Sequence, residues 1–107
     1  MELTKSERRQ LRQLAGEVYE AEAHRVLEKL DQDFERWRRN EMLSSELLGT
    51  IHDFHQHRSR ELWSMYNGAT DSMVVSRGVG LGLLPESKVP PAILVELDPD
   101  FWREGNH

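Results

Sequence analysis

An uninterrupted helical pattern over residues 4–40 limits the folds open to this chain more than any other feature. The pattern begins with Thr4-Lys5-Ser6-Glu7, which matches a capping box: the threonine and glutamate side chains each bond a free backbone N–H group of the first turn. Apolar residues then recur at intervals of three and four without an interrupting proline. They are Leu11, Leu14, Val18, Val26, Leu27, Leu30, Phe34 and Trp37. The charged residues between them are predicted to face solvent, including Glu17, Glu20 and Glu22.

A second helix is predicted after the irregular stretch at residues 40–45. Ser44 or Ser45 offers an N-cap, and the helix ends near Asn67-Gly68, where glycine tolerates the left-handed conformation of a C-cap. The residues that share its apolar face are Leu47, Leu48, Ile51, Phe54, His55, Leu62, Met65 and Tyr66. The short connection predicts an antiparallel hairpin, in which Leu30 lies near Phe54 and His55.

Two short helices are predicted in the last third, at about 71–84 and 91–97. Thr70 or Asp71 caps the first and Pro85 follows it, while Pro91 suits the first turn of the second. Buried strands over 72–84 and 92–97 are the alternative, because valines and glycines lower helix propensity. The first of these helices contains Gly78 and Gly82, four apart, which would let another helix approach closely.

The predicted fold class is therefore all-α: a long antiparallel helical hairpin of residues about 4–40 and 44–66, followed by the two short helices. A length of 107 residues indicates a single domain over 1–107. In the tail, 98–107, we expect Phe101 and Trp102 to pack partly onto the helices and the end to fray.

Composition argues against several classes of protein. A net charge of −5 opposes general attraction to nucleic acid. The chain has no cysteine for disulfides, and it has no apolar run near the roughly 20 residues that cross a bilayer. The first residues lack the apolar centre of a signal peptide. We therefore expect a cytoplasmic protein that binds neither nucleic acid nor membrane.

Helix length predicts self-association. The first helix would extend roughly 55 Å and the second about 33 Å, so the second cannot cover the first. Leu11, Leu14 and Val18 would then stay exposed, and an exposed leucine stripe marks an interface. We expect a homodimer that forms through these residues, with a further protein partner also conceivable. The alternative is that residues 70–97 fold over the same stripe and give a monomeric bundle of four helices.

Three of the five histidines lie within six residues, at His52, His55 and His57. On a helix His52 and His55 share one side, and the antiparallel register brings His52 towards Asp33. These three side chains, with water or a second chain, would suit a divalent ion such as zinc. We favour the structural interpretation, a hydrogen bond between His52 and Asp33 that fixes the register of the hairpin. The other set, Asp53, His57 and Glu61, is predicted to form a solvated ladder of opposite charges.

No complete catalytic motif is present: the Gly-x-Ser-x-Gly, Glu-x-x-His and His-Glu-x-x-His patterns are all missing, and the glycines around Gly78 do not match a nucleotide-binding fingerprint. Arg36, Arg38 and Arg39 form a basic concentration that would suit an acidic partner or phosphate, although solvated arginines explain it better. The sequence therefore favours a non-enzymatic helical interaction or regulatory protein. The alternative is a small metal-binding protein or metal-dependent hydrolase that uses His52 and His55.

Overall fold

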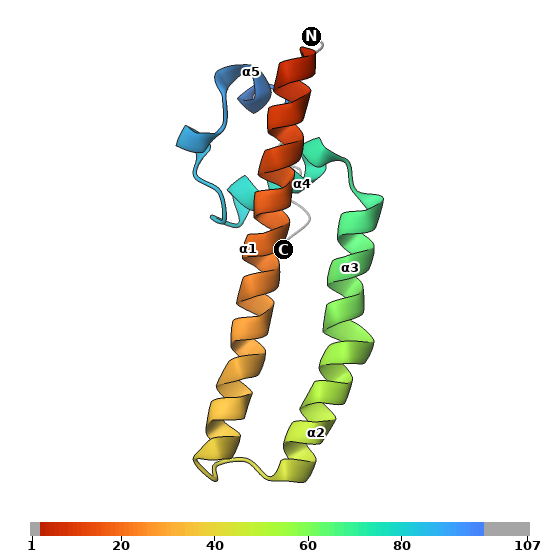
Figure 1. The fold of residues 1–107 in the computed structure, drawn as a ribbon, viewed down its shortest axis with the longest axis vertical. Helices are drawn as coiled ribbons and strands as arrows, with labels where there is room; N and C mark the ends of the chain where they lie inside the picture. Colours follow the sequence, from red (N-terminus) through yellow and green to blue (C-terminus); the bar gives the residue numbers. More distant parts are fainter. Residues whose placement is uncertain (1–2, 98–107) are drawn as a thin grey trace. The chain divides into compact units, whose positions relative to one another are not determined.

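The computed structural model describes residues 3–97, and this part of the chain is all-α (Figure 1). Helix α1 (Lys5–Arg38) is followed by α2 (Ser44–Asp53), the π-helical segment η1 (Phe54–Arg58) and α3 (Ser59–Gly68). Helix α4 (Asp71–Gly80), the 3-10 turn η2 (Glu86–Lys88) and α5 (Pro91–Leu94) follow. The predicted fold class is confirmed, and residues 3–97 contain no strand, so the strand alternatives for 72–84 and 92–97 are wrong. No helix of the described part is long and apolar enough to span a membrane.

The chain divides into two compact units that share helix α1. One unit, here called the N–C unit, combines Met1–Ala21 with Ala69–His107, and the other, the hairpin unit, is Glu22–Gly68. A single domain over 1–107 stays a prediction. The predicted packing of Phe101 and Trp102 lies outside the described residues.

The boundaries of α1 follow from local hydrogen bonds. The capping box is present at its start, where the Thr4 N–H donates to Glu7 Oε1 (2.8 Å) and the Glu7 N–H donates to Thr4 Oγ1 (3.1 Å). The helix ends at Arg38, slightly before the predicted residue 40, because Asn40 adopts a left-handed conformation with φ 61°. The Glu41 N–H then bonds the Arg36 carbonyl and the Asn40 N–H bonds that of Trp37, the pattern of a Schellman C-cap.

The second arm of the hairpin departs from the prediction at two places. Leu43, and not a serine, occupies the N-cap position of α2, and its N–H donates to Glu46 Oε1 (3.3 Å). Farther along, η1 contains a π-turn in which the Ser59 N–H bonds the carbonyl of Phe54. A π-turn inserts one extra residue and so rotates the side chains that follow it relative to a regular α-helix. The second arm therefore continues to Gly68, but its apolar face is not one straight stripe.

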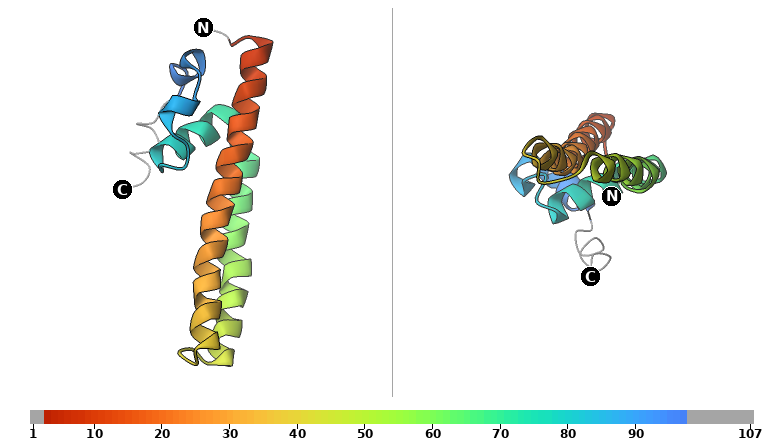
Figure 2. Two further views of the ribbon diagram at one scale, coloured as in Figure 1. Left: turned by 60° about the vertical axis from the view of Figure 1, so that its left-hand side comes forward. Right: turned by 90° about the horizontal axis from the view of Figure 1, so that it is seen from below.

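The core of the N–C unit forms where α4 crosses the first half of α1 (Figure 2). A Cβ atom added at Gly78 would overlap Val18 Cγ2, so this close approach requires glycine. The predicted role of Gly78 is confirmed, whereas Gly82 meets no neighbour and instead supplies a left-handed C-cap with φ 74°. The buried apolar residues are Leu11, Leu14, Ala15, Val18, Val74, Val75, Leu84, Val89 and Ile93.

This core removes the reason given for self-association through Leu11, Leu14 and Val18. Their exposed fractions are 6%, 9% and 1%, so the stripe is buried within one chain. The length argument considered only the second arm of the hairpin, whereas Val18 is covered by α4 at Gly78. The alternative, in which residues from 70–97 cover this part of the first helix, matches the N–C unit.

Candidate interaction surface on the hairpin

In the hairpin unit, the second half of α1 runs antiparallel to α2, η1 and α3 (Figure 1). Residues of both arms line one groove. We infer the register by matching these residues in antiparallel order: Val26 with Arg58, Leu30 with Phe54, and Asp33 with Thr50. The predicted proximity of Leu30 and Phe54 is confirmed. The two residue numbers of each pair add to about 84. The number of the residue opposite any given position is therefore found by subtracting that position from about 84.

One side of the hairpin, here called the groove face, contains a groove of about 530 Å³. Val26, Leu30 and Phe54 supply its apolar lining. Its polar lining is Lys29, Asp33, Thr50, Asp53, His57 and Arg58. Positive and negative side chains are mixed around an open hollow, and the groove therefore presents no single charge to a ligand.

The other side, here called the stripe face, follows from helical spacing. Consecutive residues of an α-helix point in directions about 100° apart. Leu27 therefore points about 100° away from the buried Val26, and Leu48 points about 100° away from the buried Leu47. Neither leucine lines the groove, and their exposed fractions are 55% and 67%. Phe34 lies two turns after Leu27 on α1, and Ile51 lies one turn after Leu48 on α2. Both are half-buried. The apolar stripe, Leu27, Phe34, Leu48 and Ile51, therefore lies on the face opposite the groove.

The histidines do not form the predicted metal set. His52 and His55 are both exposed and share the stripe face, while Asp33 lines the groove and pairs with Arg36 at 3.6 Å. Across residues 3–97, no group of three or more His, Asp or Glu side chains is placed to hold a metal ion. The position on the second arm that does pack inward is Phe54, which is half-buried and lines the groove. His55 shares the stripe face with Leu48 and Ile51, as predicted, but it is exposed.

The second histidine set, Asp53, His57 and Glu61, is exposed at all three positions, as a solvated set requires. Asp53 and His57 also line the groove. A ladder of opposite charges along these residues stays a prediction. The π-turn of η1 lies between Asp53 and Glu61 and changes their relative orientation.

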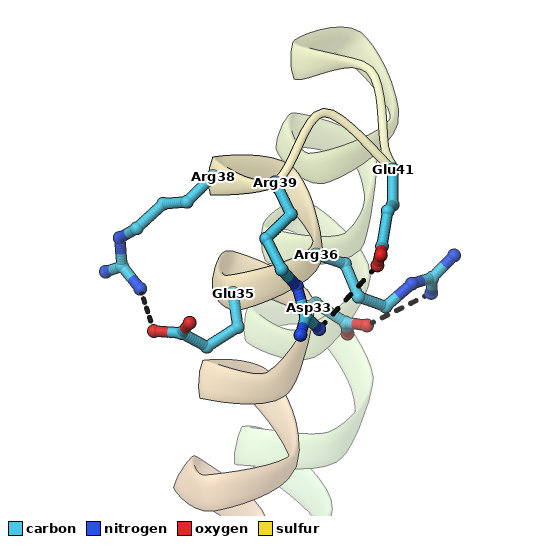
Figure 3. A network of polar contacts seen from close by, with 6 residues as sticks. All are labelled: Asp33, Glu35, Arg36, Arg38, Arg39 and Glu41. Atoms are coloured by element: carbon cyan, nitrogen blue, oxygen red, sulfur yellow. Dashed lines mark hydrogen bonds and ion pairs between the residues drawn. The ribbon is translucent and has the colours of Figure 1, made fainter.

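The basic concentration near the bend is paired with acids (Figure 3). The ion pairs are Arg36 with Asp33 (3.6 Å), Arg38 with Glu35 (2.6 Å) and Arg39 with Glu41 (3.6 Å). Each arginine side chain is about half exposed or more, so each pair contributes little to stability. Because every positive charge has a carboxylate close by, the bend carries no surplus of positive charge for an acidic ligand.

Sequence reasoning missed a buried carboxylate in this unit. Glu22 is only 4% exposed, and the Tyr66 hydroxyl donates a hydrogen bond to its Oε1 at 2.9 Å. The signal was its position: Glu22 lies four residues from both Val18 and Val26, on the apolar stripe of α1. It had been predicted to face solvent. The contact joins the two arms near the open end of the hairpin.

Comparison with models of known protein families finds no match, and comparisons with curated proteins and with solved structures find none either. The function must therefore be argued from the geometry of the chain itself.

Proposed function

We propose that this chain is a non-enzymatic helical interaction protein that self-associates through the apolar stripe of its hairpin unit. The observation that carries the proposal is the exposure of Leu27 and Leu48, 55% and 67%, beside the half-buried Phe34 and Ile51. Self-association through the first helix is retained in part, because Leu27 and Phe34 belong to α1. The surface moves from Leu11, Leu14 and Val18 to the second half of that helix.

Packing within one hairpin supports the need for a partner. Two helices meet along a single seam, and the described residues of this unit bury only Val26, Leu47 and Leu62 among their apolar side chains. Apolar residues one step away from the seam cannot reach it and remain on the surface. Exposed apolar residues that share one face mark interaction sites, and pairs of helical hairpins bury such residues by forming four-helix bundles.

The chemistry of the sequence supports a binding role over catalysis. The chain contains no complete catalytic motif. The groove face holds charged residues of both signs around a shallow apolar lining, and its acidic and basic side chains are mostly exposed. An exposed side chain is not held in the fixed geometry that acid–base chemistry requires. The apolar stripe is therefore the more informative surface.

The proposal is tested by size-exclusion chromatography with light scattering over a concentration series. We expect a dimer, with twice the chain mass of 12.5 kDa, and a shift to monomer in the Leu27→Glu, Leu48→Glu double variant. The matched control is Val95→Glu, which places the same charge on a 76% exposed residue of the N–C unit and should leave the dimer intact. A wild-type chain that stays monomeric throughout the series contradicts the proposal.

A further inference from the structure

We propose that two copies of the chain stack their stripe faces about a two-fold axis parallel to the helices, so that Asp31 of each copy lies against His52 and His55 of the other. This inference rests on the proposed function, because it specifies the arrangement of that dimer. It assigns a role to the histidine pair, which is exposed and which the described part of a single chain does not use for metal binding.

The first step is the position of the charged residues on the stripe face. The buried residues Val26 and Leu47 mark the seam between the two arms. Asp31 follows Val26 by five residues and His52 follows Leu47 by five, so each side chain points about 140° away from the seam. Both therefore lie at the outer edges of the face, beyond Leu27 on one arm and Leu48 on the other. His55 lies one turn beyond His52 at the same edge. The Asp31, His52 and His55 side chains are all exposed.

The second step is their level along the hairpin. Leu30 lines the groove together with Phe54, and Asp33 lines it together with Thr50. By this register, Asp31 is level with residue 53 of the other arm, between His52 and His55. The acidic edge on α1 and the histidine edge on α2 and η1 therefore lie at the same height but on opposite sides of one hairpin.

The third step is the symmetry of the pair. A two-fold axis parallel to the helices keeps every residue at its level and places α1 of one copy over α2 and η1 of the other. The outer edges then meet, so the Asp31 carboxylate of one copy accepts hydrogen bonds from the imidazoles of the other, and symmetry makes the contact twice. Phe34 of one copy comes level with residue 50, between Leu48 and Ile51 of the second copy. Every neighbouring helix is antiparallel, as in up-down bundles.

The charge pattern discriminates against the other way of stacking the same faces. A two-fold axis that runs across the helices would place α1 over α1. When the same stretches overlap, Asp31 would then face the second Asp31, and the histidine edge would face its own copy. Repulsion between the two Asp31 carboxylates opposes that arrangement, whereas a carboxylate that faces imidazole N–H donors favours the first one. The same apolar stripe is buried in both cases, so the flanking charges decide between them.

The test exchanges the charges across the interface. We compare Asp31→Lys, the double variant His52→Glu, His55→Glu, and a chain that combines all three substitutions. The dimer dissociation constant, measured by light scattering and analytical ultracentrifugation, should rise on the order of tenfold for each of the first two, because two symmetric contacts are lost and Asp31→Lys or the new glutamates no longer have a complementary partner. The combined chain and an equimolar mixture of the first two should regain dimerisation. Asp53→Lys on the groove face is the matched control and should dimerise as the wild type does.

The outcomes separate this inference from the proposed function. A monomeric wild-type chain overturns both. A dimer that depends on Leu27 and Leu48 but is not restored by the combined substitutions overturns only the arrangement. Circular dichroism at equal concentration identifies any variant that has lost its helices.

Disulfide cross-linking provides a second measurement that is independent of affinity. The chain contains no cysteine, so cysteines introduced singly report only on the dimer. Mild oxidation of a mixture of Asp31→Cys and His52→Cys chains should yield a covalent heterodimer. Covalent homodimers from Asp31→Cys alone, without the heterodimer, would show that α1 packs on α1 and would overturn the inference.

Discussion

The two units of the chain have nearly equal numbers of described residues but very different cores. Within residues 3–97, twelve apolar residues are buried; nine belong to the N–C unit, and the other three, Val26, Leu47 and Leu62, belong to the hairpin unit. Both units are built on the same helix with the same repeat of leucines and valines. The difference therefore comes from what lies over α1 and not from α1 itself.

The covering elements explain the contrast. In the N–C unit, α4 crosses α1 at Gly78, and residues as far along as Ile93 join the core, so the α1 stripe meets side chains from several directions. In the hairpin unit, one antiparallel arm meets α1 along one seam. The apolar stripe of one long amphipathic helix can therefore be buried over the first half of the helix and stay partly exposed over the second.

The largest effect that would test this contrast is expected at Ile93. Its side chain is fully buried, so Ile93→Ala should lower the free energy of unfolding by about 2–5 kcal/mol through lost burial and the cavity left behind. Val95→Ala, two residues along and 76% exposed, is the control and should change it by less than about 0.5 kcal/mol. Urea unfolding followed by circular dichroism measures both. Equal effects at the two positions would mean that α5 is not part of the core.

A smaller effect is expected from filling the helix crossing. Gly78→Ala places a methyl group against Val18 and should destabilise the chain by about 1–3 kcal/mol, the usual cost of overpacking. Gly16→Ala is the matched control: it lies on α1 with no neighbour within 4 Å and should stabilise the chain by up to about 1 kcal/mol through helix propensity. Thermal unfolding compares the two. A stabilising Gly78→Ala would contradict the close approach of α4 to α1.

A feature of the fold could be predicted from the sequence when the residues that determine it are close together along the chain. The capping box of Thr4 and Glu7 acts over three residues and was predicted correctly, as was the Thr70 cap of α4, whose hydroxyl accepts from the Met73 N–H. Glycine at the helix crossing was also anticipated, because Gly78 and Gly82 had the spacing for close approach. Its actual contact, Val18, could not be read from local sequence.

The errors have two physical origins. The π-turn of η1 adds one residue to a turn and leaves no trace in composition, so the orientation of Glu61 relative to Asp53 could not be obtained from a regular helical period. The coverage of the α1 stripe is a tertiary property: Leu11 and Leu27 occur in the same repeat, yet one is 6% exposed and the other 55%. A helical period identifies which residues share a face but not which part of that face is covered.

The smallest effect is expected on the stripe face, where it most directly tests the difference between the two units. Leu48→Ala should change the free energy of unfolding of the monomer by less than about 0.5 kcal/mol, because the side chain is 67% exposed. Its neighbour Leu47 is 5% exposed, and Leu47→Ala should cost about 2 kcal/mol or more. The comparison is made by chemical denaturation at concentrations below the dimer dissociation constant and repeated well above it. Leu48→Ala should become destabilising only at the higher concentration, because the leucine is then in contact with a second copy and the substitution removes that contact. If Leu48→Ala changes the free energy of unfolding equally at both concentrations, the stripe has no partner in the dimer.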